Sequence, residues 1–378
     1  MHQPLNRPYQ ICVRCIMDTS DPEIRFDASG LCNHCASYIE RCREEVFSGD
    51  EGQRRLGHII DIIKRNGAKN EYDCIIGVSG GVDSTATAYY VKKRGLRPLA
   101  VHLDNGWNSE LAVHNIKSAL DILGIDLRTH VLDWEEFRDL QLAFLRSSIE
   151  NCEIPTDHAI TALLFNTALK YGIRYIISGS NVRTEGIHPI AWSYYSHDLR
   201  LLHAIHRRFG TLPLTNYPTI GILKYFHCVF IRGIRYVNVL NYMDYHCNTA
   251  EELITRELDW RPYGAKHFES IYTRFFQGYI LPKKFGYDKR RAHLSARLMA
   301  GEITRDQALR EMERDAYADY NLREDTDFAL KKLGITMEKF ETIMRAEPRS
   351  YRDFPSYGLI LNDISFFREF SKKVAKHV

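Results

Sequence analysis

Apolar and polar positions follow two alternating periods through most of this chain. Strands are predicted at 72–78, 99–104, 127–132 and 174–178, the first of them a short apolar run. Between them, apolar residues recur three and four positions apart, which predicts helices at 86–93, 111–123, 134–148 and 158–171. Because strands and helices alternate, we expect an α/β fold in which a parallel sheet is covered by helices on both faces.

The two ends of the chain depart from this alternation. Few apolar residues occur in the first 45, and a polar helix with one apolar face is predicted over 46–71. Beyond about residue 245 the segments become helical and rich in both charged and aromatic residues. The pattern therefore divides the chain into a small module at 1–45, a sheet domain at 46–245 and a helical region at 246–378.

Composition and charge narrow the classes of protein to consider. The chain has 378 residues and a net charge of only +3, so it lacks a bulk electrostatic footprint for nucleic acid. It holds no apolar run of about 18 residues, and its start lacks the apolar segment of a signal peptide. We expect a cytoplasmic protein with no membrane span and no nucleic-acid partner. In that compartment the nine cysteines are better explained by a metal site or isolated thiols than by disulfides.

A glycine-rich stretch with the sequence SGGVDST stands between the first predicted strand and its helix. Two glycines allow a tight turn that brings backbone N–H groups to an anion, and the helix adds its positive end. Serine and threonine hydroxyls supply further donors, and Asp83 is suited to hold Mg²⁺ on the phosphates. A plain Gly-Gly turn is the alternative interpretation. The predicted phosphate-binding residues are Ser79, Gly80, Gly81, Val82, Asp83, Ser84 and Thr85.

This stretch resembles the signature of the ATP pyrophosphatases, the PP-loop family of asparagine, GMP and NAD synthetases and tRNA-thiolating enzymes. It is not a Walker loop, since no Gly-Lys-Ser/Thr closes it. The resemblance implies a domain of the adenine nucleotide alpha hydrolase type that uses ATP and Mg²⁺ and gives Asp83 a catalytic role. It also places Asp104 and Asn105, which leave the second strand, against adenine and ribose, although Asp-Asn-Gly is also a strong turn sequence. Gly179 and Asn181 follow the fourth strand and are expected near the nucleotide, with a plain turn as the alternative.

Two Cys-x-x-Cys pairs stand in the first module, at Cys12 and Cys15 and at Cys32 and Cys35. Such pairs predict a zinc ribbon or knuckle in which all four positions on Zn²⁺ are closed, so its role is structural. A redox pair and chance are the alternatives, and His34 is interpreted as a neighbour rather than a ligand. Because the module has few apolar residues, metal binding is expected to supply its folding energy.

Basic residues concentrate in the helical region. Lys266, Ser270 and Arg274 are spaced by four and are predicted to share one helical face, with Lys283 and Lys284 following. Such a set is suited to clamp a substrate that carries phosphates and a carboxylate. An ordinary solvated face is the alternative.

Lys289 and Arg290 receive their role from a resemblance rather than from spacing. The segment around them is similar to the asparagine synthetase stretch in which a lysine meets pyrophosphate. Both residues, together with Lys266, are therefore predicted to act on the phosphates during catalysis.

The double cysteine pair, the loop at 79–85 and the run at 266–295 together resemble the N-acetyl sugar amidotransferases of surface-polysaccharide biosynthesis, including lipopolysaccharide and O-antigen. What the resemblance implies is conversion of an acetamido group, on a nucleotide-linked sugar, into an acetamidino group with ATP and ammonia. The amide oxygen would first receive AMP, because oxygen is otherwise a very poor leaving group. Ammonia would then replace the AMP.

The source of ammonia is expected to be a partner. His2 follows Met1, so an N-terminal nucleophilic cysteine is excluded, and no Gly-x-Cys-x-Gly sequence occurs. In this family the resemblance implies a glutaminase subunit similar to that of imidazole glycerol phosphate synthase, with a cyclase-like subunit. A tRNA-thiolating enzyme that uses Cys152 with Cys228, and a zinc-ribbon interaction protein with an inactive nucleotide fold, are the competing interpretations.

Overall fold

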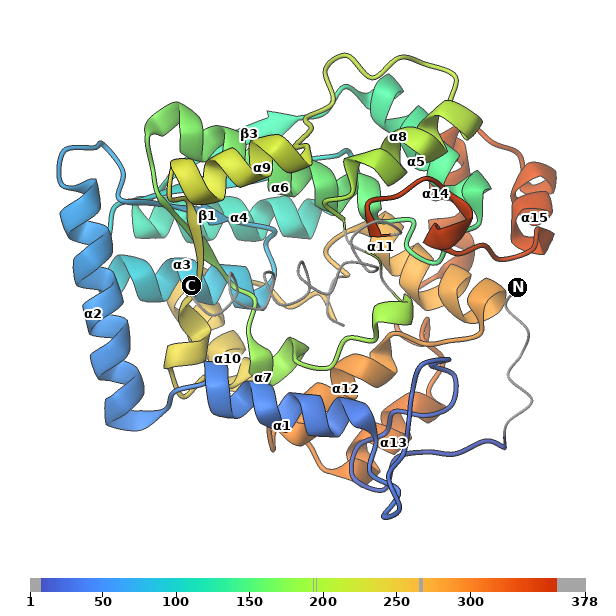
Figure 1. The fold of residues 1–378 in the computed structure, drawn as a ribbon, viewed down its shortest axis with the longest axis horizontal. Helices are drawn as coiled ribbons and strands as arrows, with labels where there is room; N and C mark the ends of the chain where they lie inside the picture. Colours follow the sequence, from blue (N-terminus) through green and yellow to red (C-terminus); the bar gives the residue numbers. More distant parts are fainter. Residues whose placement is uncertain (1–7, 193, 195, 265–267, 359–378) are drawn as a thin grey trace.

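A five-stranded parallel sheet in the order β3-β2-β1-β4-β5 forms the centre of the molecule (Figure 1). The computed structural model describes residues 8–192, 194, 196–264 and 268–358. The strands are β1 (Cys74–Gly77), β2 (Pro98–Asp104), β3 (Asp126–Val131), β4 (Tyr175–Ser178) and β5 (Arg235–Asn238). The α/β fold with a parallel sheet, predicted from the alternating periods, is confirmed.

The helices fall into a set along the sheet and a set beyond it. Up to the end of β5 they are α1 (Asn33–Glu45), α2 (Gly49–Gly67), α3 (Val82–Lys93), α4 (Glu110–Leu123), α5 (Trp134–Ser147), α6 (Ile154–Tyr171), α7 (Val182–Glu185), α8 (Leu199–Phe209) and α9 (Ile222–Phe226). After β5 they are α10 (Cys247–Leu258), α11 (Ile271–Phe275), α12 (Arg290–Met299), α13 (Arg305–Glu313), α14 (Leu322–Leu333) and α15 (Met337–Arg345). Short 3₁₀ and π segments are η1 (Ile190–Trp192), η2 (His227–Ile231), η3 (Val239–Tyr242), η4 (Phe276–Phe285) and η5 (Tyr351–Asp353).

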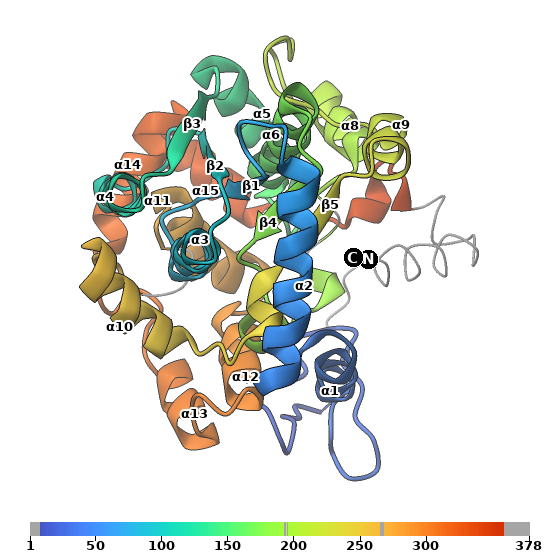
Figure 2. The same ribbon diagram turned by 90° about the vertical axis from the view of Figure 1, so that its left-hand side faces the viewer.

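Side chains of the central strands alternate between two cores, one on each face of the sheet. On β1, Cys74 and Ile76 pack with residues of α2, α3, α4 and α10, whereas Ile75 packs with residues of α6. Figure 2 shows α3, α4 and α10 on one side of the sheet and α6 and α9 on the other. Period-two alternation with both faces buried is why the central strands read as continuous apolar runs.

The order in which successive strands are added to the sheet reverses beside β1. The chain runs from β1 to β2 and β3 on one side and then crosses back to β4 and β5 on the other. Ligands of such sheets bind where the strand order reverses, at the carboxyl ends of the strands. That point lies between Gly77, the last residue of β1, and Ser178, the last residue of β4.

Several elements differ from the sequence expectation. Helices α1, α8 and α9 were not predicted. The edge strand β5 was not predicted, because Arg235–Asn238 is short and mostly polar and its pairing with β4 is a tertiary contact. Helix α6 begins at Ile154 rather than at 158, and Pro155 lies in its first turn, where a missing N–H group costs nothing. The earlier start places Asp157 inside the helix.

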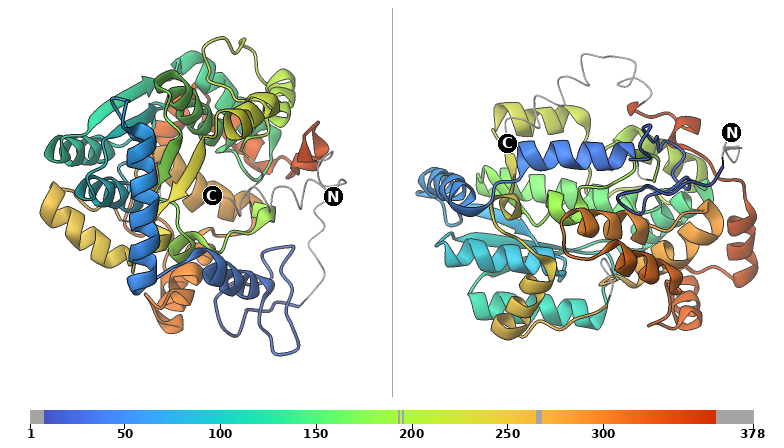
Figure 3. Two further views of the ribbon diagram at one scale, coloured as in Figure 1. Left: turned by 60° about the vertical axis from the view of Figure 1, so that its left-hand side comes forward. Right: turned by 90° about the horizontal axis from the view of Figure 1, so that it is seen from below.

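The cysteine module packs against the C-terminal helices rather than standing apart. Figure 3 shows the N-terminal loops beside α12 and α13 in both views. The backbone N–H of Ile16 donates to the Ser295 hydroxyl at 3.2 Å, and Arg291 donates to the Ile16 carbonyl at 2.7 Å and pairs with Asp18 at 3.1 Å. Residues near the start of the chain therefore hold the helix that follows Lys289. Among the described helices, none is long and apolar enough to cross a membrane.

Candidate active site

The loop from Ser79 to Ser84 joins β1 to α3 at the point where the strand order reverses. Gly80 has a φ of +84°, and a Cβ there would lie 2.8 Å from the Ala112 carbonyl oxygen of α4. Gly81 is the N-cap of α3 and supplies no side-chain cap, so the end of this helix is left to a ligand. The loop thus has the backbone shape expected of an anion cradle.

Hydroxyl groups of the loop divide between the cavity and the interior. Ser79 Oγ lies 3.4 Å from Ser84 Oγ and accepts from the Gly81 N–H at 3.3 Å. Both serines line a cavity described below. Thr85 is instead buried beneath the loop and lines neither of the two cavities, so the predicted third hydroxyl donor is not placed at the site.

Gly179 lies directly against the phosphate loop. A Cβ on Gly179 would meet the Asp83 carbonyl carbon at 2.8 Å and the Ser84 nitrogen at 2.9 Å. The absence of a side chain at this position therefore permits contact between the turn after β4 and the start of α3. The close approach expected of this glycine is made to the protein backbone.

Asn181 and Asp104 are used by the turns that contain them. The Asn181 side chain caps α7 by accepting from the Thr184 N–H at 2.9 Å. Asp104 Oδ1 accepts from the Gly106 N–H at 2.8 Å and lines neither cavity, whereas Asn105 lines one and donates to Thr156 Oγ1 at 3.1 Å. The turn interpretation therefore describes Asp104, while Asn105 remains placed to meet a ligand.

Two cavities meet at the loop. The helical cavity, of about 660 Å³, lies between the loop and the C-terminal helices and is lined by Asp83, Tyr263, Arg290 and Arg314 among others. The sheet cavity, of about 750 Å³, lies at the carboxyl ends of the strands and along α6. The residues that line both are Ser79, Ser178, Gly179, Ser180, Glu185, Glu269, Gln277, Lys289 and His293. A phosphate chain on the loop therefore adjoins both spaces.

Asp83 carries its carboxylate into the helical cavity from the first turn of α3. The Tyr245 hydroxyl donates to Asp83 Oδ1. Burial, with the charge of Asp83, raises the pKa of Tyr245 well above its usual value, so this phenol stays protonated and a donor. A carboxylate beside a backbone anion cradle fits the Mg²⁺ that accompanies ATP, and Asp83 would hold that ion.

Tyr263 and Glu269 complete this side of the site. A Cβ on Gly81 would lie 3.0 Å from the Tyr263 hydroxyl and 3.5 Å from Glu269 Oε1, so both side chains approach the loop closely. Burial, followed by the charge of Glu269, raises the pKa of Tyr263. Tyr245 and Tyr263 were missed from the sequence, because isolated residues more than 150 positions after the loop carry no local signal. Glu269 lies within the run at 266–295 but was given no role.

Lys289 reaches the junction of the two cavities. Its Nζ lies 4.0 Å from Glu153 Oε2, and both side chains are mostly buried. Arg290 also lines the helical cavity, but it pairs with Asp288 at 2.7 Å and donates to the Arg314 carbonyl at 3.0 Å. Lys289 and Arg290 were both predicted to act in catalysis. Lys289 is placed to meet a ligand, and Arg290 holds α12 to the end of α13.

The predicted basic clamp is not assembled as expected. Helix α11 begins at Ile271, so Ser270 is its N-cap and does not share a helical face with Arg274. Arg274 is instead held by Asp325 at 2.6 and 2.7 Å. Lys266 lies outside the described residues. Ser270 lines the sheet cavity.

Lys284 and Lys283 lie away from both cavities. Lys284 Nζ donates to the Ile343 and Ala346 carbonyls at 2.5 and 2.6 Å, so it caps the end of α15. Lys283 is exposed. The sequence could not reveal these assignments, because a lysine that caps a distant helix has the same spacing as one that binds a phosphate.

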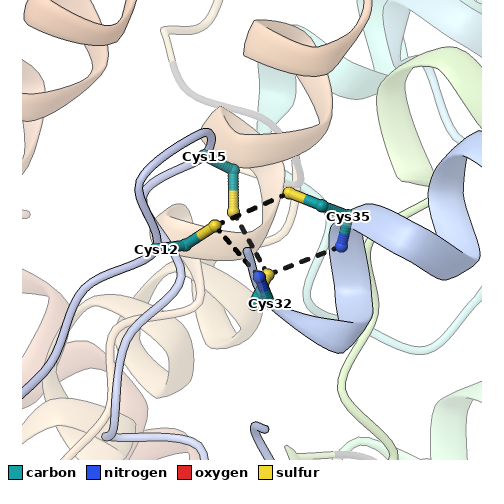
Figure 4. A group of neighbouring side chains, drawn as sticks. All are labelled: Cys12, Cys15, Cys32 and Cys35. Carbon is teal, nitrogen blue, oxygen red and sulfur yellow. Dashed lines mark hydrogen bonds between the residues drawn. The ribbon is translucent and has the colours of Figure 1, made fainter. Parts of the chain in front are cut away.

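Four cysteine sulfurs converge in the N-terminal module, and all four lie within 4.8 Å of one another (Figure 4). Cys12 Sγ is 3.8 Å from Cys35 Sγ, and Cys15 Sγ is 3.6 Å from Cys32 Sγ. Tetrahedral Zn²⁺ with bonds of about 2.3 Å needs sulfurs about 3.8 Å apart, so the group fits zinc. All four side chains are buried, which leaves no open position for a substrate.

His34 is not part of the sulfur cluster. Its Nε2 lies 2.5 Å from Asp21 Oδ2. Backbone N–H groups of Arg14 and Met17 donate instead to the sulfurs of Cys12 and Cys15, at 3.4 and 3.3 Å. These donors favour thiolates, as a structural metal requires.

Comparison with known proteins bears on the C-terminal region first. Residues 269–369 match the family described as LPS biosynthesis protein WbpG-like, C-terminal domain. This segment of the chain is therefore similar to the WbpG-like C-terminal domain. The match begins at Glu269, beside the phosphate loop, and includes Lys289 at the junction of the cavities.

A curated relative and three solved structures share between 15% and 27% sequence identity with this chain. The tRNA-specific 2-thiouridylase MnmA of Sulfurimonas denitrificans is 27% identical over 123 residues, which are 30% of this chain and 35% of that protein. The chain thus matches about a third of that relative's length. A predicted subunit of tRNA methyltransferase from Methanocaldococcus jannaschii shares 15% identity over 48% of this chain and 75% of that one, with a TM-score of 0.29.

Two synthetases show similar values. NMN synthetase from Francisella tularensis shares 16% identity over 58% of this chain and 91% of that one, with a TM-score of 0.29. The NH3-dependent NAD synthetase from Campylobacter jejuni shares 17% identity over 55% of this chain and 88% of that one, with a TM-score of 0.28.

Proposed function

We propose that this WbpG-like protein is an ATP-dependent amidotransferase of lipopolysaccharide or O-antigen biosynthesis. Its reaction would convert the acetamido group of a nucleotide-linked sugar into an acetamidino group and release AMP and pyrophosphate. The observation that carries the proposal is the junction of two cavities at the uncapped end of α3. Phosphates held there have a second reactant within reach on either side.

The chain's part in the first half-reaction is to hold charge in place. Backbone N–H groups at 80–84 and the hydroxyls of Ser79 and Ser84 would bind the phosphates, and Lys289 would neutralise charge at the junction. Mg²⁺ bound to ATP would stabilise the departing pyrophosphate. Attack of the acetamido oxygen on the α-phosphate forms an O–P bond and breaks the bond to pyrophosphate.

The second half-reaction needs neutral ammonia, since ammonium has no lone pair. A cavity that adjoins the loop shelters the activated carbon from water, which would otherwise return the amide. We propose that ammonia comes from a separate glutaminase subunit similar to that of imidazole glycerol phosphate synthase, with a cyclase-like subunit, in the cytoplasm.

Sulfur transfer to tRNA fits the described structure less well. Cys152, just before α6, and Cys228, within η2, are buried in different apolar clusters. Burial raises the pKa of the Cys152 thiol, which donates to the Ile149 carbonyl at 3.4 Å. Neither cysteine is placed as an exposed nucleophile.

Pyrophosphate release tests the proposal. Purified protein with Mg·ATP and an ammonium salt is given a panel of acetamido sugar nucleotides and, separately, bulk tRNA. We expect release with one class of sugar nucleotide and a product lighter by the exchange of oxygen for NH. Release only with tRNA, or with neither substrate, would contradict the proposal.

A further inference from the structure

Two carboxylates stand at the start of α6 on the wall of the sheet cavity, Glu153 at the N-cap and Asp157 one turn later. Glu153 accepts from Gln277 Nε2 at 2.9 Å and lies 4.0 Å from Lys289 Nζ. The Asp157 carboxylate receives neither a hydrogen bond nor an ion pair from any residue in the described part of the chain. Asp157 is exposed on the cavity wall, so its carboxylate is open to a donor from a ligand in that space.

The surroundings of Asp157 raise the pKa of its carboxyl, and desolvation is the largest cause. The walls of the cavity desolvate its carboxylate although its surface faces the open space, and Glu153 adds repulsion that Lys289 partly offsets. These effects raise the pKa of Asp157 to about 7. Burial lowers the pKa of His188, on the same cavity, to about 4, so that imidazole is neutral at pH 7.

Further ionisable groups line the sheet cavity from every element around it. Arg41 comes from α1, Glu185 from α7, Glu269 from the segment before α11, and His293 from α12. His102 lies on β2, and its Nδ1 donates to the Val78 carbonyl at 2.8 Å. Arg41 is occupied by Glu45 at 2.9 Å. The side chains that act most strongly on Asp157 remain Glu153 and Lys289.

We propose that Asp157 is the proton acceptor that converts ammonium to ammonia in the sheet cavity, an inference that rests on the proposed amidotransferase function. Ammonium transfers one proton to an Asp157 oxygen, leaving NH₃ and a neutral carboxyl. The nitrogen lone pair forms a C–N bond to the adenylated carbon, and the C–O bond breaks with its electron pair remaining on AMP. The acetamido N–H proton leaves to solvent on adenylation, so the three hydrogens of ammonia end on the two nitrogens of the amidinium. The proton on Asp157 passes to solvent.

Position supports this role as well as charge. Lys289 lines both cavities and lies beside Glu153, one helical turn from Asp157, so the acceptor adjoins the phosphate junction. Ammonia formed at Asp157 would therefore enter the cavity whose wall includes Ser79 and Lys289, at the junction with the helical cavity. A hydroxyl of the sugar is the other donor that such a carboxylate accepts, and the test separates the two.

The test compares Asp157→Asn with wild type in both half-reactions. Sugar-dependent exchange of labelled pyrophosphate into ATP reports activation without ammonia, and the variant should retain it. With ammonium at pH 7, kcat/KM for ammonium should fall about 100-fold, the usual scale of general base catalysis. The loss should shrink as pH rises, because free ammonia then needs no acceptor.

Hydroxylamine supplies the discriminating arm, since it is largely unprotonated at neutral pH. The variant should use it as well as wild type does. Asp121→Asn, on the exposed face of α4, is the matched control and should behave as wild type in all assays.

Three outcomes would overturn the inference. They are wild-type ammonium use by the Asn variant, an equal loss with hydroxylamine, and loss of pyrophosphate exchange, which would assign Asp157 to sugar binding. If wild type itself shows no exchange with any sugar nucleotide, the proposed function fails instead.

Discussion

The cysteine module and the phosphate loop both end in a tight turn at the start of a helix, yet they treat that helix end in opposite ways. Cys32 is the N-cap of α1, and its sulfur accepts from the Cys35 N–H. Gly81 is the N-cap of α3 and offers no side chain. A capped end stabilises the protein, whereas an uncapped end leaves donors for a ligand.

The supports of the two turns also differ. The module is closed by its own four cysteines, with a small set of contacts to α12. The loop depends on neighbours far away in the sequence, since Trp260 donates to the Gly80 carbonyl at 2.8 Å and Gly179 packs on the Asp83 backbone. Substitutions in the module should therefore act on stability, and substitutions around the loop should act on turnover.

Cys32→Ser should give the largest effect. It removes one of four zinc ligands, and metal binding stabilises such modules by on the order of 10 kcal/mol. We expect loss of about one zinc per chain and a large fall in Tm, measured by metal analysis and thermal unfolding.

Cys42→Ser is the matched control for that change. Cys42 lies on α1 within the same module but outside the sulfur cluster, so its replacement should leave the zinc content unchanged. A stable and active Cys32→Ser protein without metal would contradict the structural role of the site.

Asp83→Asn tests whether the Asp83 carboxylate holds Mg²⁺ at the phosphate loop. The change keeps size and shape but removes the charge that would hold Mg²⁺, so we expect pyrophosphate release to fall about 1000-fold with Tm within about 1 °C of wild type. Turnover at the wild-type rate would show that Asp83 does not hold the ion.

Gly179→Ala tests the loop through its shape. The added methyl group must displace the Asp83 backbone, and a shift of the loop by a fraction of an ångström should lower turnover about 100-fold. Overpacking should cost about 1–3 kcal/mol of stability. Steady-state kinetics and chemical unfolding measure both.

Gly57→Ala serves as the control, since a Cβ at this position in α2 meets nothing within 4 Å. It should raise stability by about 1 kcal/mol and leave turnover alone. If both glycine variants keep full activity, the contact between Gly179 and Asp83 does not shape the site.

Arg291→Met should give the smallest effect and measures how far the two regions are coupled. It removes the hydrogen bond to Ile16 and the ion pair to Asp18 while keeping the side-chain stem. We expect a loss of about 2 kcal/mol in stability with zinc retained. Because α12 follows Lys289, turnover should fall about threefold, roughly 0.7 kcal/mol of barrier.

Arg323→Met is the comparison for that variant, since its ion pair with Asp327 at 4.0 Å is exposed and should contribute almost nothing. Equal stability of the two variants would show that the module is not held to α12 through Arg291.

Local patterns carried most of what the sequence revealed. The doubled cysteine pairs and the glycine-rich loop are contiguous, so their geometry is fixed by a few neighbouring residues. The alternation of strand and helix patterns also predicted four of the five strands. Tyr245 and Asp157 reach the site only because distant segments fold together, and nothing beside them in the sequence indicates it.

The errors in the C-terminal region have one physical origin. Arg274 and Lys284 look alike as cations near aromatic residues, but one is neutralised by Asp325 and the other binds the carbonyls at the end of α15. Whether a cation serves a ligand or a helix end depends on tertiary partners. Lys289 differs because the space beside it is a cavity.

The contact between Ile16 and Ser295 joins residues 279 positions apart. During synthesis the cysteine module can therefore close soon after Cys35 leaves the ribosome, long before the helix it rests on exists. The surface of the module that later contacts α12 stays exposed to solvent until the sheet domain and α12 have been synthesised. The contact between Ile16 and Ser295 therefore forms late in folding. Early closure around a metal keeps the exposed segment compact and its thiols protected during that interval.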